Sequence, residues 1–362
     1  MLAVALEFAV LGAIILVAGV RLSHYGDVIA EKSGLGRTWI GLILIATVTS
    51  IPELATGVSS VTLVGVPEIA VGDVLGSCMF NLVIIALMDL IGGRAPISTS
   101  AHPGQVVAGG FSIVLLVIVA LSLLGGTSLP SFAGFGLYAP VILLVYAMAM
   151  RTIFQFEKRR IQEEEPGVPS DLYRSITMQK ASVMFTIVAM VIVIAASFLP
   201  RVGARLAELS GLGETFVGSL FVAFSTSLPE LVVSIAAVRM GAVDLAYGNL
   251  LGSNLFNVAL IGLDDLLYVR GPILEVVSPA HGVAALIAAA MTAVVIIALT
   301  VRSGRRFFFL AWESIALVVL YLLGVAMLYA MRMPAERLSQ APHSVGRSSV
   351  HEPSTVSMEM SS

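Results

Sequence analysis

The stretch that decides the fold contains TSIPEL at Thr49–Leu54 and GSCMFN at Gly76–Asn81, and the chain repeats it with TSLPEL at Thr226–Leu231 and GSNLFN at Gly252–Asn257. In each copy a glutamate, Glu53 or Glu230, follows a proline inside an apolar segment of helix length. A carboxylate in the middle of a membrane costs about 2.5 to 3.5 kcal/mol even on insertion scales, so such residues usually mark an ion or substrate path. Two of them at matching places strengthen that interpretation.

The composition is that of an all-α integral membrane protein. Of the 362 residues, 58% are hydrophobic and 12% are charged, and the mean hydropathy is +0.99. Soluble domains carry about 25% charged residues. The net charge of −3 gives no reason to expect a nucleic-acid partner, and the single cysteine, Cys78, excludes an internal disulfide. We expect the lipid bilayer as a partner and no cofactor.

Ten apolar runs are each close to the 20 or so residues that a spanning helix needs. They lie at 3–20, 38–62, 69–91, 105–124, 132–150, 182–200, 216–238, 244–268, 281–301 and 307–330. We expect the first five to form one half, residues 1–151 with the core motif 41–81, and the others to form a second half, residues 181–331 with the core motif 218–257. A polar linker, 152–180, joins the halves, and a disordered tail, 332–362, follows.

The number of spans in each half predicts how the halves are oriented. Five is odd, so the second half enters the membrane in the opposite direction, which is an inverted-topology repeat of the kind found in transporters. With the N-terminus outside, fourteen of the 20 Lys and Arg residues fall on the cytoplasmic side. The charges therefore predict a multi-pass protein of the cell membrane with both termini outside and the central linker in the cytoplasm.

The residues before the first glutamate share one helix face at spacings of three, four and seven: Ala46, Thr49, Ser50 and Glu53. Pro52 has no N–H, so the carbonyl of Val48 loses its helical partner, and Pro229 does the same to Ser225. We therefore expect the second and seventh spans to be broken by proline. Freed carbonyls, hydroxyls and a carboxylate form an oxygen-only set of ligands, which suits hard cations such as Na⁺ and Ca²⁺.

The GS motifs place a second polar pair on the following helix of each half. Ser77 and Asn81 are four residues apart and share a face, as do Ser253 and Asn257. If the two pairs cross at mid-membrane, two carboxylates, two carboxamides and several hydroxyls meet there. The formal charge is then −2, which one Ca²⁺ or two Na⁺ would neutralise. Competition between ions for one such site is the basis for exchange.

The two segments GLILIATVTSIPEL…VGDVLGSCMFN and GSLFVAFSTSLPEL…YGNLLGSNLFN resemble the α-repeats of the sodium/calcium exchanger family, within the cation/Ca²⁺ antiporter superfamily. The resemblance covers about forty residues in each half. It implies two inverted five-helix halves and Ca²⁺ extrusion driven by Na⁺ entry through alternating access. It also implies the ligands, which are Glu53, Glu230, Thr49, Ser50, Ser77, Thr226, Ser227, Ser253, the carbonyls of Ala46 and Ala223, and Asn81.

The sequence departs from the family pattern at three places. Many sodium/calcium exchangers have Asp where this chain has Asn257, and a prokaryotic branch with Asn in both halves is closer. We include Asn257 among the expected ligands and leave the stoichiometry and K⁺ dependence open. The other departures are Cys78, opposite Asn254 in the second copy, and Asp73, opposite Asn249. Asp73 lies one turn before Ser77 on the same face, and two interpretations are open for it: added charge on an ion path, or a polar side chain that faces a cavity.

Other interpretations compete with a Na⁺/Ca²⁺ antiporter. A glutamate can hydrogen-bond between helices, Ser and Thr can bond back to helix carbonyls, and Asn can hold helices together. An antiporter coupled to H⁺ is the alternative function, although its relatives usually carry GN-xx-EL. A channel would need a continuous pore. An enzyme is disfavoured, because the chain has no H-E-x-x-H motif and no His near the repeated serines. The oligomeric state is left open.

Overall fold

The computed structural model describes residues 1–362 apart from 93–94, 127–129, 133, 164–172, 210–223, 308–309 and 340–362. The first part of the chain forms α1 (Leu2–Ser33), α2 (Arg37–Trp39), η1 (Ile40–Ile45), α3 (Ala46–Thr49), α4 (Ile51–Ser59), η2 (Ser60–Val64), α5 (Pro67–Ile91), η3 (Ile97–Thr99), α6 (Gly104–Gly125), β1 (Ser131–Phe132), β2 (Phe135–Gly136) and α7 (Tyr138–Glu163). The second forms α8 (Met178–Leu209), α10 (Leu228–Arg239), α11 (Val243–Leu267), α12 (Ile273–Val276), α13 (Ala280–Val301), β3 (Arg306–Phe307), β4 (Leu310–Ala311) and α14 (Trp312–Ser339).

The described residues form a bundle of long apolar helices. Eight of these helices are long and apolar enough to cross a membrane, and the bent pair Arg37–Thr49 and Ile51–Val64 makes a ninth such span. The seventh of the ten expected spans, 216–238, begins outside the described residues, and its described part contains α10. The all-helical membrane architecture is therefore confirmed, while the count of ten and the inverted repeat stay predictions.

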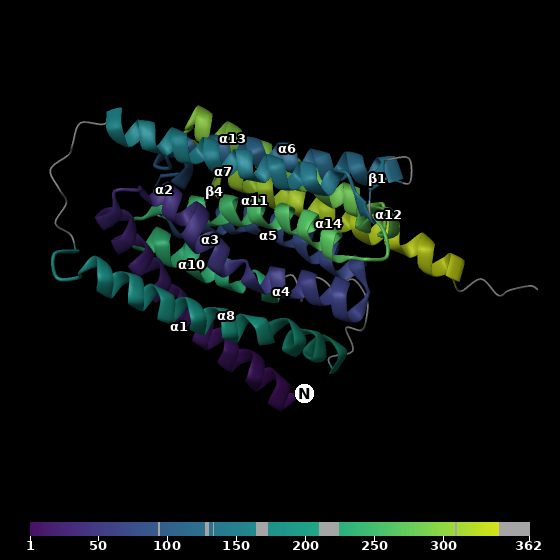
Figure 1. Ribbon diagram of the computed structural model, residues 1–362. Coiled ribbons are helices and arrows are strands. Elements are labelled where there is room, and N and C mark those ends of the chain that lie inside the picture. The colour runs from purple at the N-terminus through teal and green to yellow at the C-terminus, as the bar shows by residue number, and fades with distance from the viewer. Residues whose placement is uncertain are drawn as a thin grey trace, which may run out of the picture.

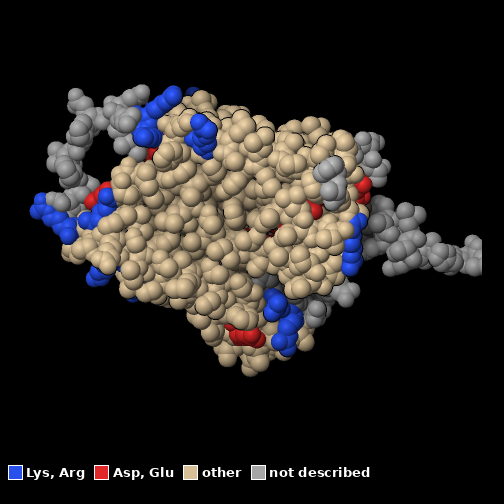
Figure 2. Space-filling model, viewed as in Figure 1, with Lys and Arg blue, Asp and Glu red and all other residues tan. Residues whose placement is uncertain are grey.

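The helices lie roughly along one direction (Figure 1), and charge is distributed accordingly. On the face shown in Figure 2, Lys, Arg, Asp and Glu gather mostly toward the two ends of the bundle, and the broad middle is almost free of them. Such a belt is what contact with the hydrocarbon of a bilayer requires, because exposed charge there is costly. The outer surfaces of the helices are accordingly apolar, as for Leu144 and Leu322, which are exposed.

The central layer contains the two repeated stretches packed against each other. Helix α11 contacts η1, α3, α4, α5 and α10. Glycines permit this contact, because a Cβ on Gly252 would lie 2.3 Å from the carbonyl oxygen of Leu42, and one on Gly41 would lie 2.4 Å from that of Leu245. The backbones of η1 and α11 therefore touch directly. Helices α1 and α8 lie side by side at one edge of the bundle (Figure 1).

Two aspartates fasten the far ends of α5 and α11 to short hairpins. Asp89 accepts hydrogen bonds from the backbone N–H groups of Ile97 (3.2 Å) and Ala311 (2.9 Å), and so ties α5 to the antiparallel pair β3–β4. Asp265 accepts from the N–H groups of Ile273 (2.6 Å) and Gly136 (2.8 Å), which ties α11 to the pair β1–β2. Asp89 and Asp265 therefore have a structural role, and the two halves use it in the same way.

The ends of the polar segments differ from the expected boundaries. Helix α7 continues to Glu163, well into the expected linker 152–180, because a polar but strongly helix-forming run, EKRRIQE, follows its apolar part. Helix α14 continues to Ser339, past the expected start of the tail at 332. In the described part of the linker, Tyr173 donates a hydrogen bond to Asp27 of α1 at 2.7 Å. Burial and this hydrogen bond raise the pKa of Tyr173 to about 12.

Candidate ion-binding site

Each repeated stretch contains a helix that is interrupted at a serine. Ser50, between α3 and α4, has φ −92° and ψ 10°, and Ser227, immediately before α10, has φ −84° and ψ 7°. Both lie in the sparsely populated bridge region, two residues before a proline. The helix direction changes by 42° between Arg37–Thr49 and Ile51–Val64. The same backbone conformation therefore occurs at the same place in both copies.

The side chains near these interruptions are withdrawn from the surface. Glu53 and Glu230 are 0% exposed, although charged groups are almost never fully buried without a partner. The other expected side-chain ligands are also 0% exposed: Thr49, Ser50, Ser77, Asn81, Thr226, Ser227, Ser253 and Asn257. The structure therefore places all ten expected side-chain ligands inside the bundle. Ala46 is buried as well, and Ala223 lies outside the described residues.

Glu230 is held by hydroxyls from both halves. Its Oε1 accepts hydrogen bonds from Ser50 Oγ at 2.9 Å and from Ser253 Oγ at 3.3 Å. Beside it, the Oγ1 atom of Thr49 lies 3.4 Å from Ser253 Oγ and donates to Asn249 Oδ1 at 3.1 Å. The interrupted helix of the first half is thus bonded to the glutamate and to the polar helix of the second.

Glu53 has the matching set of partners. Its Oε1 accepts from Ser77 Oγ at 3.3 Å and from Ser227 Oγ at 3.4 Å, and Ser227 also lies 3.0 Å from Ser77. Thr226 Oγ1 lies 3.4 Å from Ser77 Oγ and donates to Asp73 Oδ1 at 3.1 Å. Every contact described for Glu230 therefore has its equivalent here, so the two copies meet around one central site.

Four oxygens of this site are left over. Glu53 Oε2, Glu230 Oε2, Asn81 Oδ1 and Asn257 Oδ1 are buried and have no hydrogen-bond partner. Burying an ionised carboxylate without compensation costs several kcal/mol, and buried charges are therefore paired or coordinate metals. Two carboxylate and two amide oxygens together form a ligand set for a hard cation. We call these four residues, with the serine and threonine hydroxyls bonded to them, the central site.

The asparagines of the central site differ in one respect. Asn81 Nδ2 donates to Asn254 Oδ1 at 3.0 Å, so its amide is oriented by a neighbour. The equivalent bond from Asn257 would need an acceptor side chain at position 78, which is a cysteine, and neither polar atom of Asn257 has a partner. Asn254 instead donates to the carbonyl of Cys78 at 3.1 Å. Sequence reasoning missed Asn254 and Asn249, although both lie in the repeated motif.

The chemistry of the central site is selective. Within the described residues, no group of three or more His, Cys, Asp or Glu side chains is arranged to hold a metal ion. The donors of the central site are carboxylate, amide and hydroxyl oxygens, which are the ligands that hard cations such as Na⁺ and Ca²⁺ prefer. The carbonyl of Ala46 accepts from Ser50 N (3.0 Å) and Thr49 Oγ1 (3.3 Å), so its role as a ligand stays a prediction.

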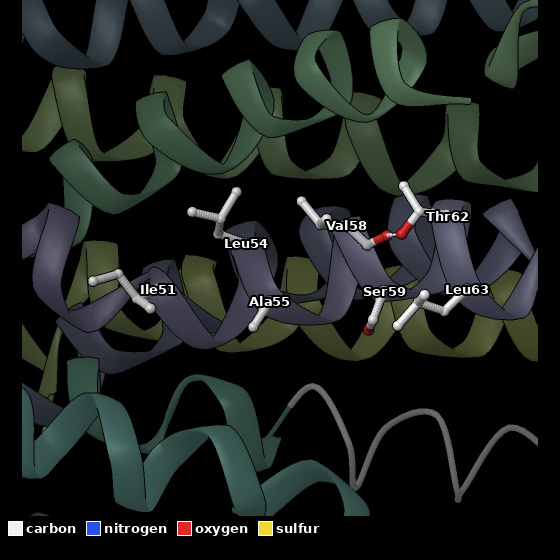
Figure 3. Close-up of a pocket in the computed structure, with 7 residues that line it drawn as sticks. All are labelled: Ile51, Leu54, Ala55, Val58, Ser59, Thr62 and Leu63. Carbon is white, nitrogen blue, oxygen red and sulfur yellow. Dashed lines mark hydrogen bonds between the residues drawn. The ribbon is translucent and has the colours of Figure 1, made fainter. Parts of the chain in front are cut away.

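The outer side of the interrupted helix has a different character. A groove of about 350 Å³ runs along α4 and η2 (Figure 3). It is lined by Ile51, Leu54, Ala55, Val58, Ser59, Thr62 and Leu63. The polar atom of Thr62 bonds back to the carbonyl of Val58 at 2.6 Å. The residues that line the groove carry no charge, so it forms part of the apolar outer surface of the bundle.

Comparison with known proteins agrees with this geometry. The family model described as sodium/calcium exchanger protein matches residues 4–154 and 180–330. The chain is 28% identical over 302 residues to the sodium/calcium exchanger MaX1 of Methanosarcina acetivorans, covering 71% of this chain and 81% of that protein. It is 27% identical over 250 residues to the inner membrane protein YrbG of Escherichia coli, covering 68% and 74%.

Solved structures show the same fold. A structure of the sodium-calcium exchanger NCX_Mj, soaked with Na⁺ and Sr²⁺, superposes with a TM-score of 0.67 at 20% identity, over 90% of this chain and 99% of that one. At this identity the likeness is one of fold alone. The family model, however, spans most of both halves, including both interrupted helices. The chain therefore belongs to the sodium/calcium exchanger protein family.

Proposed function

We propose that this protein is a secondary antiporter that exchanges Na⁺ for Ca²⁺ at the central site by alternating access. The observation that carries the proposal is the set of four buried oxygens without partners, two of them from carboxylates. Family membership supports cation/Ca²⁺ antiport, and the oxygen-only chemistry supports these two ions in particular.

The charge of the central site gives a physical reason for coupling. With both glutamates ionised the site carries −2, which one Ca²⁺ or two Na⁺ neutralise. A site without an ion or a proton would leave two buried carboxylates uncompensated, at several kcal/mol each. The protein therefore switches the side to which the site is open only when an ion fills the site. The same oxygens cannot bind Ca²⁺ and Na⁺ at the same time. The ions thus exchange for one another.

The two halves supply the movement. The hydrogen bonds around each glutamate involve residues from both halves, as in the bond from Ser50 to Glu230. A small rotation of one half against the other would open the central site to one side and close it to the other, as in other repeat transporters. We further propose that the protein lies in the cell membrane with both termini outside and the linker in the cytoplasm, as the distribution of Lys and Arg predicts.

The test is ⁴⁵Ca²⁺ uptake into Na⁺-loaded proteoliposomes, with and without an outward Na⁺ gradient. We expect uptake that depends on the gradient and that is lost in Glu53→Gln and in Glu230→Gln. The control is Glu7→Gln, which removes an exposed carboxylate of α1. Uptake that survives either central substitution in correctly folded protein would contradict the proposal.

H⁺ coupling is the second candidate, because both central carboxylates are buried and a proton would neutralise each of them. The discriminating measurement is Ca²⁺ flux after a pH jump in the absence of Na⁺. Robust flux under these conditions would assign the protein to proton-coupled exchange. Flux that requires Na⁺ and ignores the pH gradient would exclude it.

A further inference from the structure

One buried cluster breaks the match between the two copies. In the second copy, Asn249 Nδ2 donates to Ser234 Oγ at 3.0 Å, so the position beside Glu230 is neutral and hydrogen-bonded. The corresponding residues of the first copy are Asp73 and Gly57, since Gly57 lies four residues after Glu53 as Ser234 does after Glu230. An acid thus replaces the amide of Asn249, and a glycine replaces the serine to which that amide donates.

A second acid occupies the space that the missing side chain leaves. A Cβ built on Gly57 would lie 2.5 Å from Asp264 Oδ2, so the carboxylate of Asp264 is seated directly against the glycine backbone. Asp264 has no equivalent in the first half, where the matching residue is Met88. Its neighbour Asp265, which binds backbone N–H groups, does have an equivalent. The acidic cluster of Asp73 and Asp264 is therefore a feature of one side only.

Both acids are buried and incompletely satisfied. Asp73 is 6% exposed and Asp264 is 1% exposed, and Asp73 Oδ2 and Asp264 Oδ1 are buried without a hydrogen-bond partner. Within the described ranges, no Lys, Arg or His forms an ion pair with either of them. Asp73 lies close enough to interact electrostatically with Asp264 and with Glu53. Such an arrangement is unfavourable unless a cation or a proton neutralises the buried charge.

The cluster lies to one side of the central site along the bundle. Gly57 lies one turn beyond Glu53 toward the end of α4, Asp73 lies in the second turn of α5, and Asp264 lies in the last turn of α11. All three are therefore displaced toward the same end of the bundle. Thr226 connects the cluster to the central site, because its hydroxyl contacts Asp73 at 3.1 Å and Ser77 at 3.4 Å.

We propose that Asp73 and Asp264, beside Gly57, form a second cation site that binds a hard cation, Ca²⁺ or Na⁺, on its way between one end of the bundle and the central site. This inference rests on the proposed function for the choice of ion, and on the two unpartnered acids for the site itself. It makes the two access routes unequal, since the second copy offers a neutral amide and hydroxyl at the equivalent place.

The experiment measures equilibrium ⁴⁵Ca²⁺ binding and, separately, ²²Na⁺ binding to the purified full-length protein in detergent. The variants are Asp73→Asn with Asp264→Asn, and Glu53→Gln with Glu230→Gln, with Glu7→Gln as the control for loss of a carboxylate. We expect the central-site variant to retain a cation-binding component that the Asp73/Asp264 variant loses. A loss of ⁴⁵Ca²⁺ identifies the ion as Ca²⁺, and a loss of ²²Na⁺ identifies it as Na⁺.

A second variant keeps both charges. Gly57→Ala places a methyl group where the Asp264 carboxylate lies. We expect it to weaken the cation binding that depends on Asp73 and Asp264 by at least about tenfold, because changes in the residues around a metal ligand reduce metal affinity by this much. Unchanged ⁴⁵Ca²⁺ and ²²Na⁺ binding in both the Asp73/Asp264 variant and Gly57→Ala would overturn the inference, and the two acids would then be a structural pair that shares a proton.

The two proposals fail in different ways. If the Asp73/Asp264 variant binds as the parent protein does while ⁴⁵Ca²⁺ uptake still depends on Na⁺ and on Glu53 and Glu230, only the second site is wrong. If ⁴⁵Ca²⁺ uptake depends neither on Na⁺ nor on the central glutamates, the proposed function is wrong. The binding measurement on the Asp73/Asp264 variant still tests the second site in that case.

Discussion

The two copies of the repeat agree around the central site and disagree one turn away from it. Glu53 and Glu230 each accept one hydroxyl from their own half and one from the other half, at 2.9 to 3.4 Å. One turn further, the first copy has Asp73 and Gly57, with the carboxylate of Asp264 seated against that glycine, and the second has Asn249 bonded to Ser234. The central site thus needs both copies in the same form, whereas the approach to it does not.

The difference has a physical basis. A site that opens to each side in turn must present similar ligands to both sides, so substitutions there are constrained in pairs. An approach route is used from one side only, and its charge can be set independently. If the second site exists as proposed, Asp73 and Asp264 raise the negative charge of one route and concentrate cations there. The other route remains neutral at Asn249.

The largest expected effect tests the agreement at the centre. Glu53→Gln and Glu230→Gln should each reduce Na⁺-dependent Ca²⁺ uptake by more than about 100-fold, because removing one partner of a buried charged arrangement costs about 3 to 5 kcal/mol. The two losses should be equal within a factor of a few, since the contacts match. If one of the two variants loses Na⁺-dependent Ca²⁺ uptake and the other keeps it, the two copies are not equivalent.

The next effect tests the close contact that brings the copies together. Gly252→Ala should destabilise the protein by about 1 to 3 kcal/mol or more, because its Cβ would meet the backbone oxygen of Leu42 at 2.3 Å. Gly110→Ala on α6 is the matched control, since a Cβ there meets nothing within 4 Å. Thermal unfolding in detergent measures both. Equal melting temperatures would contradict backbone-to-backbone packing of η1 on α11.

A smaller effect distinguishes the serines that cross between the copies. Ser50 donates to Glu230 at 2.9 Å, while Ser227 donates to Glu53 at 3.4 Å and also lies 3.0 Å from Ser77. Hydrogen bonds to charged groups contribute about 1.5 to 3 kcal/mol. We expect Ser50→Ala to lower Ca²⁺ affinity by about tenfold or more, and Ser227→Ala to lower it less. The reverse order in ⁴⁵Ca²⁺ competition would refute this ranking.

The smallest effect lies outside the repeat, in the linker. Tyr173→Phe should cost about 0.5 to 1.5 kcal/mol by removing the hydrogen bond to Asp27. Because the folded pKa of Tyr173, about 12, exceeds the ordinary value of 10.0, this contribution is fully present below pH 10 and is lost as the pH rises through about 12. Melting temperatures of the parent protein and Tyr173→Phe should therefore converge at high pH.

Tyr321→Phe is the control for that measurement, because the Tyr321 hydroxyl makes no hydrogen bond within the described residues. We expect it to leave the melting temperature unchanged at neutral pH. A difference between parent and Tyr173→Phe that persists above pH 12 would show that the ring packing, and not the hydroxyl, fastens the linker to α1.

Much of the central site was predictable because the repeat supplies an internal comparison. Two copies of one motif indicated which polar residues matter, and helical spacing placed Thr49, Ser50 and Glu53 on one face. The extent of α7 was not predictable in the same way. Its last turns are polar in composition but helix-forming in propensity, and composition alone suggested a linker there.

The sequence by itself determined the class of protein, the repeated motifs and the buried polar residues, because membrane insertion and helical periodicity act along the chain and need no knowledge of distant contacts. Only the tertiary structure decided how the copies share their ligands, and that Asp264 lies against Gly57. These two residues are far apart in the sequence, and the acid at position 264 has no equivalent in the first half. Their meeting depends on how closely α4 and α11 pack, which side-chain volume and backbone contact determine together.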